Sequence, residues 1–175
     1  MKYNNIEFEA IIATPGVGKS FLCDNDKRFI DADEERLRCK YYVPDNISRE
    51  ELERTKGNRT FKKRVKKDEY IDMFYKKLDD YVKEGKIIIA APHPESFNYF
   101  ASRNMKFVFI YPSLKMRKEM IDRMIKRGNS NEFVDDNNDL FEDFYKSNAE
   151  EKRSAFNYEM QSGEYLSEII KKFGL

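Results

Sequence analysis

The segment with the clearest chemical pattern is ATPGVGKS, residues 13–20, which matches the phosphate-binding loop pattern with alanine in place of the first glycine. Glycines at positions 16 and 18 let the backbone bend so that its N–H groups point toward a phosphate, and the start of the following helix adds a favourable dipole. We expect Lys19 to reach the terminal phosphates and the Ser20 hydroxyl to bind Mg²⁺. The alternative is a glycine-rich turn before an ordinary helix. The expected nucleotide-binding residues are Thr14, Gly16, Val17, Gly18, Lys19, Ser20 and Phe21.

A second pattern is FIDAD, residues 29–33, in which Asp31 and Asp33 alternate at the end of a predicted strand and so share one face. The ends of strands beside a phosphate loop are where open parallel sheets bind ligands. Two carboxylates there can hold the waters of a magnesium ion, or accept a proton from an attacking hydroxyl. Alternatively, one or both cap the following helix, with Glu34 and Glu35 in its first turn.

The third pattern is RMIKRGN, residues 123–129, which places Arg123 and Arg127 one helical turn apart. The polar stretch NSNEFVDDNND follows at residues 129–139, and we interpret it as a loop or lid. Two guanidinium groups leading into such a lid can clamp a transferring phosphoryl group when the lid closes. The alternative is a solvated basic face.

The elements that must position these residues are short apolar runs separated by amphipathic stretches, a pattern that indicates an α/β fold with a parallel sheet. Two runs are almost wholly apolar, as central strands covered on both faces are. Helices are predicted over Asp68–Glu84 and Ser113–Arg127, each with its apolar residues on one face. The predicted strands are Glu7–Ala13, Arg28–Ala32, Lys86–Ala91, Met105–Tyr111 and Phe156–Met160.

Length and composition favour a single folded domain of 175 residues and 21.0 kDa, in which 14 Phe and 11 Tyr supply packing area. A net charge of +1 gives the whole molecule no strong preference for nucleic acid or membrane. Cys23 and Cys39 are too few for a disulfide framework, so we expect reduced thiols. The sequence shows neither a signal-peptide pattern nor an apolar run long enough to cross a membrane. We therefore expect a cytoplasmic protein, either a monomer or a homodimer.

Together, ATPGVGKS after the first strand, FIDAD at the second and RMIKRG before a lid resemble the small P-loop kinases, namely the nucleoside monophosphate kinases and shikimate-type kinases. The short polar chain is also similar to the nucleotide-kinase-like proteins of bacterial viruses. The resemblance implies a three-layer P-loop kinase fold whose five-stranded parallel sheet has the order 2-3-1-4-5. It further implies a helical acceptor flap at about residues 40–67 and a short lid at about residues 128–139.

The same resemblance implies roles for individual residues. ATP phosphates would lie on Gly16, Gly18 and Lys19, and Mg²⁺ on Ser20 and Asp31, with acceptor contacts from Asp33. Arg123 and Arg127 match the lid arginines that hold phosphates during transfer, so they join Lys19 as the expected catalytic residues. Near the C-terminus, SGEYLSEII at residues 162–170 is similar to the turn and helix against which such kinases pack part of the adenine.

The chain departs from the family pattern after the third strand, where it carries AAPHPES at residues 90–96. His93, the only histidine, either contacts the acceptor or its base, or fills the turn between two prolines. No aspartate ends the third or fourth predicted strand, so Asp31 or Asp33 is the expected metal carboxylate.

The segment RTKGNRTFKKRVKK, residues 54–67, has eight basic residues and no acidic one, and it falls within the implied flap. There, Arg59 or Arg64 would grip a monophosphate. Three interpretations of the remaining charges are open. Most of them form a solvated helix face, or they bind a larger acceptor such as a nucleic acid, or they attract the acidic run at residues 132–151 when flap and lid close.

The function expected from these patterns is an ATP- and Mg²⁺-dependent phosphotransferase acting on a nucleoside or deoxynucleoside monophosphate. The alternatives are a kinase of nucleic acid, acting on an end or a modified base, and an NTP-binding switch or interaction protein without transfer activity.

Overall fold

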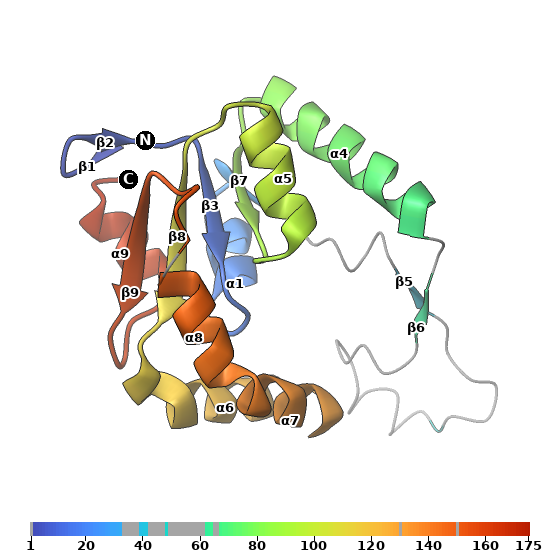
Figure 1. Cartoon of the computed structure of the whole chain (residues 1–175), viewed down its shortest axis with the longest axis vertical. Coiled ribbons are helices and arrows are strands. Elements are labelled where there is room, and N and C mark those ends of the chain that lie inside the picture. The colour runs from blue at the N-terminus through green and yellow to red at the C-terminus, as the bar shows by residue number, and fades with distance from the viewer. Residues whose placement is uncertain are drawn as a thin grey trace.

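The centre of the fold is a five-stranded sheet in which all strand pairs are parallel. The computed structural model describes residues 2–32, 39–41, 48, 62–64, 67–129, 131–149 and 151–175. The sheet strands are β3 (Ala10–Ala13), β4 (Phe29–Ala32), β7 (Ile87–Ala90), β8 (Phe107–Pro112) and β9 (Phe156–Met160). They stand side by side in the order β4-β7-β3-β8-β9 (Figure 1).

The strand labels in this order differ from the expected 2-3-1-4-5 because the labels also count strands that lie outside this sheet. They form two antiparallel pairs, β1 (Lys2–Tyr3) with β2 (Ile6–Glu7) and β5 (Cys39–Tyr41) with β6 (Lys62–Arg64). Counted within the sheet alone, the strands stand as second, third, first, fourth and fifth along the chain.

The predicted first strand, Glu7–Ala13, is shorter than expected because Glu7 belongs to the β1–β2 hairpin. Asn4 and Asn5 turn this hairpin with φ angles of 48° and 65°, the left-handed conformation that two-residue hairpin loops need and that asparagine tolerates. The other four predicted strands match sheet strands to within two residues at each end, and Phe156–Met160 coincides with β9.

Helices lie on both sides of the sheet, giving the α/β architecture that the sequence predicts (Figure 1). Figure 1 also shows α6 and α7 at the end toward which the sheet strands point. The helices are α1 (Lys19–Asn25), α4 (Lys67–Lys83), α5 (Pro94–Ser102), α6 (Arg117–Lys126) after the 3₁₀ turn η1 (Leu114–Met116), α7 (Asn131–Asp139), α8 (Phe141–Ala149) and α9 (Leu166–Lys172).

Alternation along the strands divides the core into two layers, because successive side chains of a strand point to opposite faces. Ile11 of β3 packs in one buried cluster, with apolar residues of α1, α6 and α9. Its neighbour Ile12 packs in the other cluster, with aromatic residues of α4 and α5. Both isoleucines are fully buried, as in a central strand covered on two faces.

The polar stretch after Gly128 contains the helix α7, where the sequence analysis expected a loop or lid. Val134 is buried, and Arg117 of α6 donates to the side chain and carbonyl of Asn138 at 3.0 and 2.8 Å. Arg117 also pairs with Glu142 of α8 at 3.3 Å. These tertiary contacts outweigh the weak helix propensity of a run of Asp and Asn.

The helix α1 has only seven residues, because the chain turns at once into β4. Asp26 adopts an extended conformation at the helix end. Its carboxylate accepts hydrogen bonds from the backbone N–H of Arg28 and from the Arg28 guanidinium, at 2.7–3.1 Å. This local turn stops the helix and leads directly to Phe29, the first residue of β4.

Candidate functional site

The phosphate-loop pattern lies between the end of β3 and the start of α1, as the sequence predicts. Gly16 and Gly18 have φ angles of 83° and 98°, a region in which residues with a Cβ are strained. Val17 between them is buried, and its carbonyl accepts a hydrogen bond from the N–H of Leu166 at 2.9 Å. A hydrogen bond from Leu166, near the C-terminus of the chain, therefore helps to hold the conformation of the loop.

The Lys19 side chain folds back over the loop. Its Nζ donates to the carbonyls of Ala13 and Thr14, at 3.1 and 3.0 Å. The hydroxyl of Thr14 is buried, and among the described residues it has no hydrogen-bond partner. A buried polar atom without a partner is costly, so an added ligand or water that satisfies it is stabilised here.

The Ser20 hydroxyl of α1 and the Asp31 carboxylate of β4 lie 3.1 Å apart. This contact brings together the two residues predicted to hold Mg²⁺. Both offer the hard oxygen donors that Mg²⁺ prefers, and this ion commonly takes one or two protein ligands, with phosphates and waters completing its shell. Within the described residues there is no group of three or more His, Cys, Asp or Glu that could hold a metal without such help. The donor set thus fits Mg²⁺ that arrives with a phosphate ligand.

Two segments distant in sequence pack closely against the loop. A Cβ placed on Gly16 would lie 2.8 Å from Cε of Met120, a buried residue of α6. A Cβ on Gly18 would lie 3.5 Å from Cδ1 of Tyr165, just before α9. The loop glycines are therefore required by their backbone conformation, and a Cβ at Gly16 would in addition displace the terminal methyl of the buried Met120.

The two arginines of α6 have different surroundings. The side chain of Arg123 is 10 % exposed. Its guanidinium pairs with Glu119, donates to the Glu164 carbonyl at 2.9 Å and lies 3.9 Å from the centroid of the Tyr165 ring. Arg127 is exposed at the end of α6, where Gly128 terminates the helix with a φ of 83°. The predicted catalytic roles of both arginines stay predictions.

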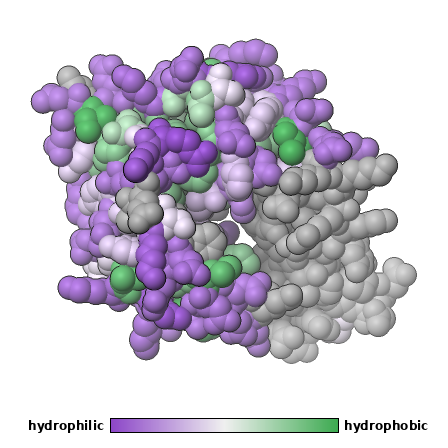
Figure 2. Space-filling model, in the orientation of Figure 1, coloured by the Kyte–Doolittle hydropathy of each residue, from purple (hydrophilic) through white to green (hydrophobic). Residues whose placement is uncertain are grey.

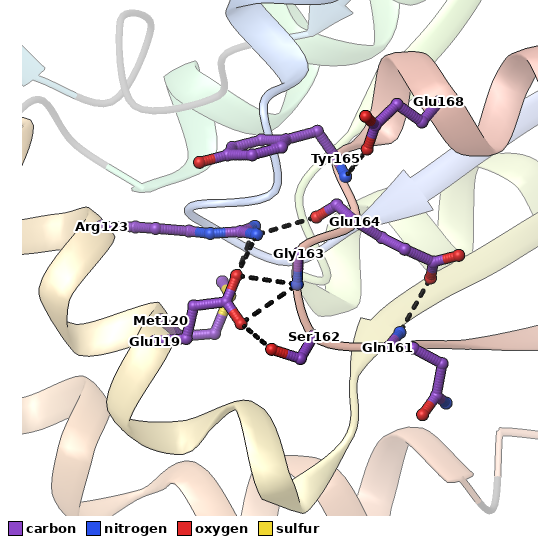
Figure 3. Close-up of polar contacts among 9 residues, drawn as sticks. All are labelled: Glu119, Met120, Arg123, Gln161, Ser162, Gly163, Glu164, Tyr165 and Glu168. Carbon is purple, nitrogen blue, oxygen red and sulfur yellow. Dashed lines mark hydrogen bonds and ion pairs between the residues drawn. The ribbon is translucent and has the colours of Figure 1, made fainter.

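Glu119, for which the sequence predicts no role, connects α6 to the turn at residues 161–165 (Figure 3). Its carboxylate accepts hydrogen bonds from the Ser162 hydroxyl at 2.8 Å and from the Gly163 N–H at 3.2 Å, in addition to Arg123. Burial opposes ionisation of Glu119, but these hydrogen bonds and the Arg123 charge hold the pKa of its carboxyl below the ordinary value. The i,i+4 spacing of Glu119 and Arg123 was the only sequence signal for this contact.

The structure describes only some of the residues that were predicted to contact the acceptor. His93 follows β7 and precedes Pro94, the first residue of α5; its carbonyl accepts the N–H of Ser96 at 2.9 Å, so it begins the helix. Arg64 lies in β6, and its side chain is outside the described residues. Asp33 and Arg59 also lie outside them.

Cys23 of α1 lies beside the candidate metal site and is half-buried. Burial, together with the nearby carboxylates of Asp31 and Asp24, raises the pKa of its thiol to about 12, although Lys19 acts in the opposite direction. A thiol with such a pKa is protonated at neutral pH, so it is a poor nucleophile there.

The surface around the described elements is mostly hydrophilic on the face shown in Figure 2, where apolar groups are small and separated by polar ones. Phe21, the residue after Ser20, has 63 % of its surface exposed. Among the described residues, no helix has the length and apolar character to cross a membrane.

Comparison of the chain with models of known protein families gives no match, and comparison with curated protein sequences gives no match either.

Proposed function

We propose that this protein is an ATP- and Mg²⁺-dependent phosphotransferase of the P-loop kinase type, with a nucleoside or deoxynucleoside monophosphate as the acceptor. The observation that carries the proposal is the approach of Ser20 to Asp31, 3.1 Å, beside a glycine loop over which Lys19 is folded. In a P-loop these residues bind the metal and the phosphates. The strand order within the sheet and the helices on its two faces support a three-layer P-loop kinase fold.

In this proposal, the loop backbone and Lys19 bind the β- and γ-phosphates of ATP. Lys19 would exchange its contacts with the Ala13 and Thr14 carbonyls for phosphate oxygens. Mg²⁺ held by Ser20 and Asp31 would neutralise charge on those oxygens. Catalysis then consists of holding the donor and acceptor in line and stabilising the charge that develops, without a covalent intermediate on the protein.

The acceptor site is proposed at the end of the sheet where β4 and β7 finish. Asp33 follows β4 in the sequence, and His93 follows β7. Because neighbouring parallel strands end at the same edge, the ends of β4 and β7 lie at the same edge of the sheet as the phosphate loop after β3. In the proposal, Arg127, which is exposed at the end of α6, supplies a positive charge for the transferring group.

The experiment is transfer of label from γ-labelled ATP with Mg²⁺ to a panel of ribo- and deoxynucleoside monophosphates, single- and double-stranded DNA, and RNA. Lys19→Ala is the inactive control, and Lys27→Ala is its matched partner because Lys27 is exposed and its side chain donates to the nearby Asp24 carbonyl at 3.2 Å. Label on one or a few monophosphates supports the proposal, and an active Lys19→Ala protein contradicts it.

The basic segment at residues 54–67 favours nucleic acid as the second candidate acceptor, because its eight charges exceed what one monophosphate needs. Label on the polymers alone, lost steeply between low and moderate salt, would support this candidate. ATP binding without transfer to any acceptor would instead indicate an NTP-binding switch or interaction protein.

A further inference from the structure

Glu119 is the only carboxylate described on α6 that reaches the turn at residues 161–165, and each of its oxygens is engaged there. Oε2 accepts the Ser162 hydroxyl at 2.8 Å, both oxygens accept the Gly163 N–H at 3.2 Å, and Oε1 pairs with Arg123. Figure 3 shows the carboxylate between the guanidinium and the turn. Its side chain is 28 % exposed, so these contacts are only partly screened by water.

Arg123 depends on Glu119 for the neutralisation of its charge. Its side chain is 90 % buried, with the guanidinium over the Tyr165 ring, and its other described acceptors, the Glu164 carbonyl and the Met120 sulfur, are uncharged. A buried cation that loses its carboxylate becomes much less stable in its position. The orientation of Arg123 over Tyr165 therefore requires the charge of Glu119.

The turn at residues 161–165 holds its own shape without Glu119. Glu164 accepts the N–H of Gln161 at 2.8 Å, and Glu168 accepts the N–H of Tyr165 at 2.8 Å (Figure 3). The contacts of Glu119 thus determine where the turn lies relative to α6 more than how it is folded.

The position of this turn matters to the phosphate loop. Leu166, directly after the turn, donates to the Val17 carbonyl at 2.9 Å, and the Tyr165 ring lies so near Gly18 that a Cβ placed there would be 3.5 Å from it. Movement of the turn away from α6 would therefore change the support of the loop as well as the stack of Arg123 on Tyr165.

We propose that Glu119 is a positioning residue of the nucleotide site, which holds Arg123 and the 161–165 turn in place against the phosphate loop. The inference rests on the proposed function, since it concerns binding of ATP at that loop. Glu119 acts through Arg123 and the turn, and it does not itself touch the nucleotide.

The test is binding of the non-hydrolysable analogue AMP-PNP with Mg²⁺ to the full chain, measured by calorimetry. Glu119→Gln keeps the size of the side chain but removes its charge, and it should weaken binding roughly tenfold, the equivalent of one charge-assisted hydrogen bond. Asp122→Asn is the matched control: Asp122 is an exposed carboxylate of the same helix that pairs with Lys118 at 2.9 Å, and its change should shift Kd less than about twofold. Ser162→Ala removes one contact of Glu119 without leaving a charge unpaired, so it tests the same inference if Glu119→Gln does not fold.

A double-mutant cycle distinguishes positioning from general stability. If Glu119 acts largely through Arg123, then Glu119→Gln in an Arg123→Ala background should weaken binding less than about threefold; equal losses in both backgrounds, together with unchanged binding for Ser162→Ala, overturn the inference. In the transfer assay, Glu119→Gln should raise KM for ATP about tenfold and leave KM for the acceptor within about twofold, whereas a loss of folded protein lowers kcat alone.

The AMP-PNP binding results distinguish a failure of this inference from a failure of the proposed function. Wild-type protein that binds AMP-PNP, with Glu119→Gln and Ser162→Ala binding equally well, overturns the inference alone. Wild-type protein that binds no AMP-PNP removes the nucleotide site, and the inference with it.

Discussion

The hydroxyl of Ser20 and the carboxylate of Asp31 lie 3.1 Å apart although they belong to different elements, α1 and β4. The strand β7 stands between β3 and β4 in the sheet, so the chain passes over it in α1 to reach β4. This crossover is what brings the first residues of α1 to the end of β4. The pairing of a loop serine with a strand carboxylate thus follows from the topology of the sheet.

Asp31→Asn should raise the Mg²⁺ concentration needed for half-maximal activity by about tenfold or more, the usual effect of weakening a metal site. Ser20→Ala should act in the same direction, because it removes the other oxygen donor. Asp24→Asn is the control, since Asp24 is an exposed carboxylate of α1, the helix that carries Ser20. A Mg²⁺ titration of transfer activity measures the effect; equal curves for Asp31→Asn and Asp24→Asn would remove Asp31 from the metal site.

Arg127→Ala should lower kcat by about a hundredfold, the size of effect seen when a donor to transition-state charge is removed. Affinity for ATP should change less than about threefold, because the loop and Lys19 hold the ground state. Lys126→Ala removes an exposed charge from the adjacent position of α6 and should leave kcat unchanged. Steady-state kinetics on the acceptor found in the label-transfer assay provides the measurement, and an unchanged turnover for Arg127→Ala would place that arginine on the solvated surface.

Gly16→Ala should destabilise the protein more than Gly85→Ala, although both glycines have positive φ angles, 83° and 69°. Each substitution costs about 1–2 kcal/mol for the left-handed backbone. Only Gly16 adds a collision, since its Cβ would lie 2.8 Å from Met120, whereas Gly85 has open space. Overpacking of that kind costs about 1–3 kcal/mol more. Urea unfolding of the two variants measures the difference, and equal losses would mean that Met120 shifts freely.

Local sequence patterns were enough to predict the sheet strands and the position of the glycine loop, because both depend on residues close together in the sequence. The apolar runs around Ile11 and Ile88 predict buried parallel strands, and the spacing of Gly16, Gly18 and Lys19 predicts the loop between a strand and a helix. The contact of Ser20 with Asp31 could also be predicted, since strand ends beside such a loop converge.

The surroundings of Arg123 could not be predicted, because they depend on residues far away in the sequence. Glu164 and Tyr165 reach Arg123 only after β9 has returned the chain to the edge of the sheet. The helix α7 was missed for a related reason, since its run of Asp and Asn has low helix propensity and tertiary contacts from Arg117 hold it. The short distance from Lys19 to the next predicted strand does predict a short helix α1, but the turn of Asp26 with Arg28 that ends it is a local contact whose geometry the sequence does not reveal.

Cys23 should react slowly with iodoacetamide at pH 8, roughly a thousandfold slower in the folded protein than in concentrated urea, because only the thiolate is nucleophilic. Its pKa in the folded protein is raised from 9.0 to about 12, first by burial and then by Asp31. The raised pKa means that the unfolded chain loses its proton first, so this group's contribution to stability is complete below about pH 9 and is lost as the pH rises toward 12. Asp31→Asn removes one of the causes and should speed the modification, while Asp143→Asn, an exposed carboxylate of α8, should not. Mass spectrometry of the alkylated peptide separates Cys23 from Cys39, and rapid labelling of folded wild-type Cys23 at pH 8 would show that the thiol is neither buried nor held protonated beside Asp31.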